Sequence, residues 1–188
     1  SVVLKTLGGQ LPVGICGTGI LSAIAELLKN GILNHLGNLD QTHPCVRTHN
    51  GQTAFVLANA SETEHGQDIL ITRRDINEIQ LAKGAIRTGI DVLLEVADLD
   101  ANAVEAWIIA GAFGTYLDIS SAMRIKMFPD LPIGRYYQVG NAAGVGAKQM
   151  LISDAKRHEA TQLIKDVDYI ELTIYPGFKD KFVKSLYY

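Results

Sequence analysis

Hydrophobic residues alternate along this chain between two spacings, one typical of buried strands and one typical of helices. The run Ala106-Trp107-Ile108-Ile109-Ala110 is continuously apolar, which favours a strand buried on both faces, and residues 136–139 repeat the pattern. Between residues 72 and 94, apolar side chains recur every three or four positions, as expected for a long amphipathic helix. Strands that alternate with helices in this way predict an α/β fold.

Capping and turn residues predict the element boundaries in the first half of the chain. Thr72 is suited to cap the long helix, and Asp75 stands in the capping-box position. Gly31 is suited to end an earlier helix over residues 20–28. The other expected elements are strands at 2–4, 53–58 and 69–71, a turn at 61–67, and a surface excursion at 34–66 that is polar and turn-rich over 34–52.

Similar signals divide the second half. Asp100 is expected to cap a short turn and Asp118 a helix ending near Ile125, with a loop at 129–132. The remaining expected elements are a helix from Asn141 or Ala142, a helix from Ser153 to about residue 167, a strand at 169–174 and a last helix from Pro176.

Composition narrows the class of protein. Of the 188 residues, 47% are hydrophobic and 20% are charged, a globular composition with room for a sizeable core. Seventeen basic and twenty acidic residues give a formal charge of −3, which argues against nucleic acid and anionic membranes as partners. No stretch reaches the roughly 20 apolar residues of a membrane span.

The cysteines and histidines suggest no metal centre. Cys16 and Cys45 are too few for a disulfide framework, a four-thiolate zinc site or an iron–sulfur cluster, and they fit a reducing cytoplasm. His43, Cys45 and His49 lack a zinc spacing, so we expect a polar loop without structural metal. Cys16 is interpreted as a small buried residue in a tight turn rather than a reactive thiol. Because the chain begins with Ser1 and not Met, we expect it to be part of a longer protein.

Three glycine-rich turns each precede a predicted helix. They are Gly14-Ile15-Cys16-Gly17-Thr18-Gly19, Gly111-Ala112-Phe113-Gly114 and Gly140-Asn141-Ala142-Ala143-Gly144. Glycine lets backbone N–H groups approach a ligand and helix N-termini favour anions, so the three turns predict phosphate or nucleotide binding. Ser22 breaks the dinucleotide fingerprint, and Ala147 before Lys148 excludes a Walker A loop. Lys83, one residue from the apolar stripe of the long helix, is either a solvated lysine or part of this site.

Five motifs occur in an order that resembles one family. They are Gly14-Ile15-Cys16-Gly17-Thr18-Gly19, Gln80-Leu81-Ala82-Lys83-Gly84-Ala85-Ile86, Ala110-Gly111-Ala112-Phe113-Gly114-Thr115-Tyr116-Leu117-Asp118, Pro129-Asp130-Leu131-Pro132 and Val139-Gly140-Asn141-Ala142-Ala143-Gly144. The tail Leu186-Tyr187-Tyr188 fits the same pattern. Over nearly its whole length the chain resembles the C-terminal part of the reductive activators of corrinoid proteins, the RACo-type activating enzymes of methyltransferase and O-demethylase systems.

The resemblance implies an actin-like ATPase fold of the ribonuclease H-like type, from the actin, heat-shock chaperone and sugar-kinase superfamily. Residues 1–188 would form its second lobe, a mixed sheet packed with helices. The implied activity uses ATP with Mg²⁺ to drive an electron onto cob(II)alamin and so restore cob(I)alamin in a corrinoid protein. A 2Fe–2S cluster would belong to an N-terminal domain outside this chain. The catalytic carboxylates would lie mostly in the other lobe, so no catalytic residue and no metal ligand is assigned here.

The resemblance also implies nucleotide contacts. Gln80 and Lys83 would hold the ribose, with the Lys83 ammonium in a cleft beside the 111–114 turn, and Gly84 would leave the face of the base open. The other implied contacts are Gly17, Thr18, Gly19, Gly111, Ala112, Phe113, Gly114, Gly140 and Asn141. Ala112 stands where the superfamily has a second glycine.

The sequence leaves one alternative function open and argues against another. The chain is expected to contact the corrinoid protein, and the alternative is a docking or dimerisation module for that protein without independent ATP binding. A homodimer is compatible with either function. A stand-alone acyl- or sugar-kinase-like enzyme would require a complete two-lobe fold, for which 188 residues are too few.

Overall fold

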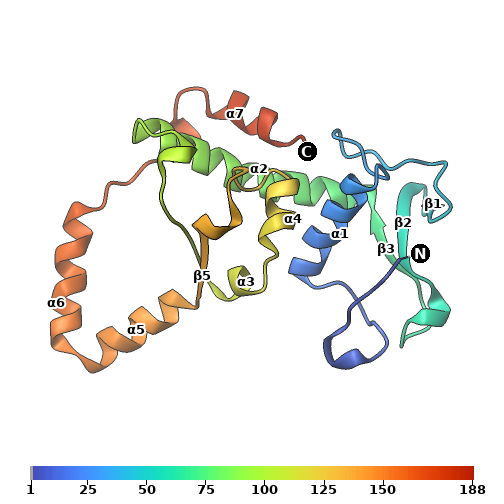
Figure 1. Ribbon diagram of the computed structural model, residues 1–188, viewed down its shortest axis with the longest axis horizontal. Helices are drawn as coiled ribbons and strands as arrows, with labels where there is room; N and C mark the ends of the chain where they lie inside the picture. Colours follow the sequence, from blue (N-terminus) through green and yellow to red (C-terminus); the bar gives the residue numbers. More distant parts are fainter. Residues whose placement is uncertain (1) are drawn as a thin grey trace.

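The strands of the protein form two separate sheets in the computed structural model, which describes residues 2–188 (Figure 1). Strands β1 (Val46–His49), β2 (Gln52–Ala58) and β3 (Ile69–Thr72) pair antiparallel in the order β1-β2-β3. Strands β4 (Trp107–Ala110) and β5 (Tyr136–Gly140) pair parallel. The predicted α/β class is confirmed, and Ser1, the first residue of the expected single domain, lies outside the described residues.

Seven α-helices accompany the sheets in the described part of the chain. They are α1 (Gly17–Lys29), α2 (Arg73–Val96), α3 (Ala112–Thr115), α4 (Ile119–Arg124), α5 (Ala142–Ile152), α6 (Asp154–Leu163) and α7 (Phe178–Ser185). Among residues 2–188, no helix combines the length and the apolar character that a membrane span requires.

The predicted caps are confirmed. The Thr72 side chain accepts the Asp75 N–H while the Asp75 carboxylate accepts the Thr72 N–H, which completes the capping box of α2. Gly31 has φ of 70° beyond the end of α1, a conformation that glycine adopts without strain. Asp118 caps α4, and Asn141 caps α5.

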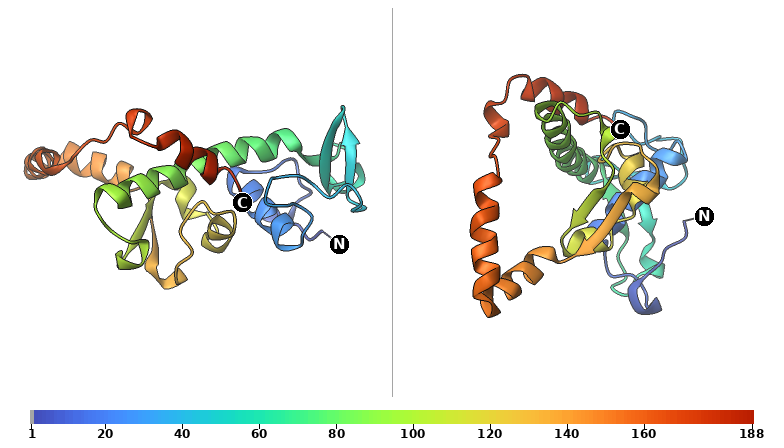
Figure 2. Two further views of the ribbon diagram at one scale, coloured as in Figure 1. Left: turned by 90° about the horizontal axis from the view of Figure 1, so that it is seen from above. Right: turned by 60° about the vertical axis from the view of Figure 1, so that its left-hand side comes forward.

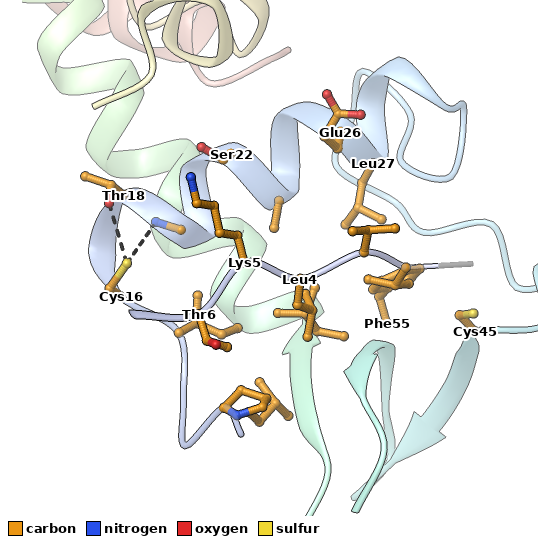
Figure 3. A pocket seen from close by; sticks show the side chains of 18 of the residues that line it. Leu4, Lys5, Thr6, Cys16, Thr18, Ser22, Glu26, Leu27, Cys45 and Phe55 are labelled. Carbon is orange, nitrogen blue, oxygen red and sulfur yellow. Dashed lines mark hydrogen bonds between the residues drawn. The ribbon is translucent and has the colours of Figure 1, made fainter. Parts of the chain in front are cut away.

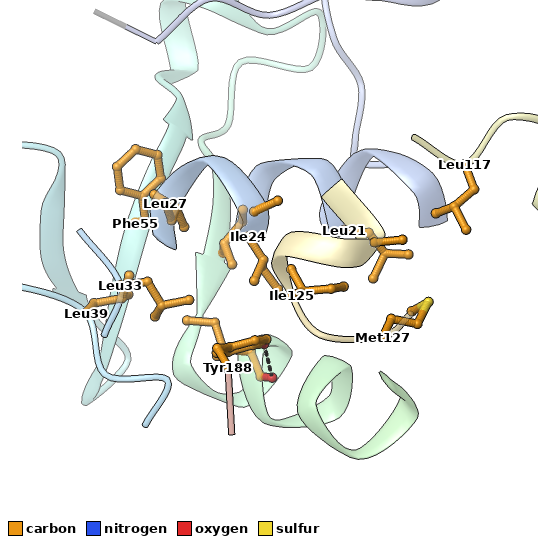
Figure 4. Close-up of a cluster of buried hydrophobic side chains, with 14 residues drawn as sticks. Leu21, Ile24, Leu27, Leu33, Leu39, Phe55, Leu117, Ile125, Met127 and Tyr188 are labelled. Atoms are coloured by element: carbon orange, nitrogen blue, oxygen red, sulfur yellow. Dashed lines mark hydrogen bonds between the residues drawn. The ribbon is translucent and has the colours of Figure 1, made fainter. Parts of the chain in front are cut away.

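The core lies where α1 packs between α4 and the antiparallel sheet, with the start of α2 and the end of the chain below it (Figure 4). Ile24 of α1 and Ile71 of β3 have no exposed surface. Burying one such side chain stabilises a fold by about 1.5–3 kcal/mol. The full cluster is Leu21, Ile24, Ala25, Leu27, Leu33, Leu39, Phe55, Ile71, Ile76, Leu117, Ala122, Ile125, Met127 and Tyr188.

The expected burial of β4 and β5 on both faces is wrong. The side chain of Ile108 is 67% exposed, and Tyr137 and Val139 are about half exposed. Burial alternates along β4, because one face packs on the body while the other has no covering layer within residues 2–188. Although the sequence of β4 is apolar throughout, only every second side chain of this strand is partly buried.

Three other expectations are also wrong. Residues 34–66 are not simply a surface excursion, since they contain the unpredicted strand β1, and Ala54 and Phe55 of the predicted strand β2 are buried. Residues 2–4 are in no strand, and residues 169–174 contain a 3-10 turn at Leu172–Ile174 instead of a strand. Residues with high β-propensity form a strand only where a neighbouring strand pairs with them. Residues 169–174 have no such neighbour among the described residues, and Tyr169 and Ile174 are more than three-quarters exposed.

Helices α5 and α6 form an arm, residues 142–163, which projects away from the rest of the chain before the chain returns through α7 (Figures 1 and 2). Neither helix of the arm has a buried residue. The last helix, α7, instead packs along α2.

Candidate functional site

The three glycine-rich turns come together in the folded chain. The first and second turns are close, because a Cβ atom added to Gly17 would lie 2.8 Å from the Phe113 ring. The second and third turns are joined by a hydrogen bond of 2.7 Å, in which the Gly111 N–H donates to the Gly140 carbonyl. The second and third turns follow the carboxyl ends of β4 and β5, which is where ligands bind in parallel α/β sheets.

Glycine is required at the ends of the two parallel strands. Gly111 has φ of 106° and Gly140 has φ of 68°, values that side chains with a Cβ rarely adopt. Gln138 supports the second turn, since its side-chain amide donates to the carbonyls of Gly114 at 2.5 Å and Leu117 at 2.8 Å. Asn141 then begins α5, where its side chain accepts the Gly144 N–H at 3.0 Å. The backbone of the turns after β4 and β5, the junction of the three glycine-rich turns, is therefore held in defined positions.

Cys16 caps α1 at the edge of this junction. Its sulfur lies 3.5 Å from the Thr18 hydroxyl and accepts the Gly19 N–H at 3.3 Å. The Thr18 hydroxyl and then the Gly19 N–H lower the pKa of the thiol below its usual value. The residue is exposed, so the interpretation of Cys16 as a buried filler of a tight turn is wrong. A thiol at the N-cap position can accept an N–H group of the first helical turn, as a serine hydroxyl does. A side chain in that position lies at the end of the helix, where it is open to solvent.

A cleft of about 1030 Å³ opens beside Cys16 (Figure 3). The extended residues 2–6 form one wall, one face of α1 forms another, and the antiparallel sheet closes the side that contains Phe55. Lys5, Ser22 and Glu26 add polar groups to this cleft. Sequence reasoning missed these three residues, because no local pattern indicates that residues 2–6 cross α1.

Gln80, Lys83 and Gly84 do not belong to this junction. The Lys83 ammonium donates to the Tyr187 carbonyl at 2.5 Å, and Lys83 has no exposed surface. The Gln80 amide donates to the Leu186 carbonyl at 3.2 Å. The expectation that Lys83 faces an open cleft beside the 111–114 turn is therefore wrong, because the end of the chain covers its ammonium.

Burial makes Lys83 an unusual lysine. Removal from water lowers its pKa to about 8, and the positive charges of Lys126 and Arg87 act in the same direction. The face of the Tyr188 ring lies 4.9 Å from the ammonium, in the arrangement of a cation–π contact. No ion pair with a carboxylate is found for Lys83 among the described residues.

The histidines do not assemble a ligand set in the part of the chain that the structure describes. Across residues 2–188, no three side chains of His, Cys, Asp or Glu are grouped as a metal site would require. The His43 ring instead accepts the Cys45 N–H at 3.2 Å and lies against the Phe55 ring.

Comparison with known proteins gives one consistent family. A family model described as the C-terminal domain of RACo, the ASKHA domain, matches residues 1–188. A solved structure, the reductive activator for corrinoid,iron-sulfur protein, is 37% identical, with a TM-score of 0.90 over 97% of this chain and 30% of that one. These matches define the fold as an α/β domain of the ASKHA class. The chain belongs to the family of RACo C-terminal domains, as its motifs suggested.

Two curated relatives have related names. The corrinoid activation enzyme RamQ of Eubacterium limosum is 32% identical over 193 residues, which cover 98% of this chain and 32% of RamQ. The [Co(II) methylated amine-specific corrinoid protein] reductase of Methanosarcina barkeri is 25% identical over 187 residues, covering 98% of this chain and 31% of the reductase. This chain therefore spans about a third of the length of the relatives that it matches.

Proposed function

We propose that this chain is the nucleotide-binding part of an ATP-dependent reductive activator that reduces cob(II)alamin to cob(I)alamin in a corrinoid protein. The observation that carries the proposal is the convergence of the three glycine-rich turns at the ends of β4 and β5. The names of the relatives, a corrinoid activation enzyme and a corrinoid protein reductase, support the choice of reaction.

In the proposed site, backbone N–H groups at the starts of α1 and α5 attract phosphate, since helix N-termini favour anions. The contacts are Gly17, Thr18, Gly19, Gly111, Ala112, Gly114, Gly140 and Asn141. Phe113, about half exposed beside Gly17, offers its ring to the base. We leave Gln80, Lys83 and Gly84 out of this site, because their contacts are with residues 185–187.

The remaining chemistry is assigned to parts of the protein outside this chain. Mg²⁺ prefers carboxylate and phosphate oxygens, and no cluster of three acidic or other ligating residues occurs within residues 2–188. Two cysteines do not suffice for a 2Fe–2S cluster with four thiolates. The proposed role of this chain is to bind ATP more tightly in one arrangement of the two lobes, which shifts the protein toward that arrangement.

Calorimetric titration of ATP into the full-length protein tests the proposal. Gly17→Ala places a Cβ 2.8 Å from Phe113 and displaces the ring, so we expect ATP binding to weaken by about tenfold, or about 1.4 kcal/mol. Gly134→Ala is the matched control, because its Cβ would meet no atom within 4 Å. Absence of ATP binding by the wild-type protein, or equal affinity of both variants and the wild type, would refute the assignment.

A second proposed function is a docking or dimerisation module for the corrinoid protein, in which this chain does not bind ATP independently. It is favoured by the arm, where Leu151 is 80% exposed and Ile152 is 74% exposed. Leu151→Glu is expected to weaken binding of the corrinoid protein while leaving ATP affinity unchanged. Ile133→Glu, an exposed apolar position outside the arm, is the control.

We also propose a cytoplasmic location, which the two free thiols support. A homodimer remains a candidate assembly.

A further inference from the structure

We infer that residues 186–188 form a strap that docks on α2 and helps to hold the preceding segment, residues 164–185, against the body. The docking surface, which we call the seat, consists of Gln80, Lys83 and Gly84 together with the backbone at 35–36. The inference follows from the contacts of the strap and does not depend on ATP binding.

Each residue of the strap has a polar partner in the body. Gln80 donates to the Leu186 carbonyl at 3.2 Å, and Lys83 donates to the Tyr187 carbonyl at 2.5 Å. The Tyr188 N–H donates to the His35 carbonyl at 3.0 Å. Since a buried polar group is costly to leave unpaired, the seat is matched to the backbone groups of a peptide rather than to a bare apolar surface.

The Tyr188 side chain provides the apolar part of the docking. Its ring is 5% exposed and belongs to the core cluster, while its hydroxyl donates to the Ile76 carbonyl at 3.4 Å (Figure 4). The adjacent Tyr187 ring is 45% exposed, so the strap inserts one of its two tyrosines. The Lys83 ammonium lies over the inserted ring.

Gly84 allows the close approach of strap and helix. A Cβ atom at this position would lie 3.1 Å from the Leu186 side chain and 3.2 Å from the Ser185 carbonyl oxygen. The second of these atoms belongs to the backbone and cannot move aside alone. The absence of a side chain at Gly84 therefore sets how closely the strap lies on α2.

Apart from the packing of α7 along α2, few contacts hold the segment from α5 to α7 against the body. Neither α5, α6 nor α7 has a buried residue. In the described chain, the side-chain hydrogen bonds of residues 142–165 all remain within residues 141–165. Helix α7 makes an ion pair from Lys181 to Glu95 at 2.6 Å, but both side chains are at least one-third exposed, and such pairs contribute little. Tyr188 is the one buried residue among the described residues 164–188, so the strap supplies the buried part of the anchoring, while α7 adds partly exposed contacts along α2.

Loss of the strap is expected to loosen residues 164–185 without unfolding the antiparallel sheet. Local opening of weakly packed segments is a separate event from global unfolding and is measured by amide hydrogen exchange. The segment leaves the body after β5 and returns along α2 through α7, so loss of its one buried anchor, Tyr188, is expected to make opening of residues 164–185 easier.

Hydrogen exchange of glycine variants in the full-length protein tests the inference. Gly84→Ala favours the helical state of α2 but pushes against Ser185 and Leu186, so exchange in residues 164–185 is expected to rise by about tenfold. Gly89→Ala on the same helix is the matched control, because its Cβ meets only the Leu172 side chain at an ordinary 3.7 Å. If Gly84 has no role in seating the strap, both alanine variants should only stabilise α2, and exchange should be slower in both.

Tyr188→Ala tests the same inference from the strap side, with Tyr187→Ala as its control. We expect faster exchange in residues 164–185 for Tyr188→Ala, little change in β2 and β3, and wild-type exchange for Tyr187→Ala. Unchanged exchange of residues 164–185 in both Gly84→Ala and Tyr188→Ala would overturn the inference. An equal rise in β2 and β3 would also overturn it, because Tyr188 would then act only through the core. If Tyr188→Ala fails to fold, the glycine pair decides.

Discussion

Two regions of this protein have similarly apolar sequences and bury them very differently. In the region of α1, β3 and α4, Ile24 and Ile71 have no exposed surface. In the region of β4, β5 and the arm, Ile108 is 67% exposed and Leu151 is 80% exposed. In the first region α4, the antiparallel sheet and the start of α2 cover the apolar side chains of α1, and the second region has one uncovered face within the described residues. Apolar sequence predicts that a segment can be buried, and the arrangement of its neighbours decides whether it is.

The largest expected effect is on the covered region. Ile24→Ala removes a fully buried side chain from the centre of the cluster, so the free energy of unfolding is expected to fall by about 2–5 kcal/mol. Urea denaturation followed by circular dichroism measures this change. A loss below about 1 kcal/mol would show that the α1 region is not the stable core, and the comparison would then fail.

An effect of intermediate size is expected from pH, through Lys83 of α2, whose ammonium lies over the Tyr188 ring at the edge of the covered region. Its pKa is about 8 in the folded chain and near 10.5 when exposed, so between pH 8 and 10 the unfolded chain binds the proton more strongly. The free energy of unfolding should therefore rise with pH, by at most about 1.4 kcal/mol per unit. Above pH 10 the trend should reverse, because burial raises the pKa of Tyr188 and only the unfolded chain releases that proton.

Denaturation at several pH values, repeated with Lys83→Met, measures this dependence. Methionine keeps an apolar stem and removes the titrating group, so the rise between pH 8 and 10 should disappear in the variant. A rise of the same size in both proteins would assign the pH dependence to another group.

The smallest expected effect is on the open face. Ile108→Ala removes a side chain that is mostly in contact with solvent, so the unfolding free energy of this chain should change by about 0.5 kcal/mol or less. The same denaturation experiment gives the comparison with Ile24→Ala. Similar losses in the two variants would mean that the β4 face is covered in solution, and the difference between the two regions would disappear.

The sequence by itself determined the features that depend on neighbouring residues. The capping box of Thr72 and Asp75, the left-handed Gly31 and the cap at Asp118 lie where these residues predict them, and α5 begins at one of its two predicted starts. Such features depend on hydrogen bonds and backbone angles within one helical turn, so the residues that determine them are neighbours in the sequence. The motifs also indicated the RACo family correctly, and the glycine-rich turns were expected to form one site.

Only the tertiary structure decided the burial of side chains and the partners of Gln80 and Lys83. The apolar run at β4 predicted two buried faces, yet one face has no neighbour in the described residues. Lys83 reads as a polar residue on an amphipathic helix, and its ammonium is covered by Tyr187 and Tyr188, about one hundred positions further along. Burial and long-range hydrogen bonds depend on which elements meet in space, and no local pattern specifies that meeting. For this reason the sequence located the elements and the turns, while the packing of the last three residues on α2 decided what Gln80, Lys83 and Gly84 contact.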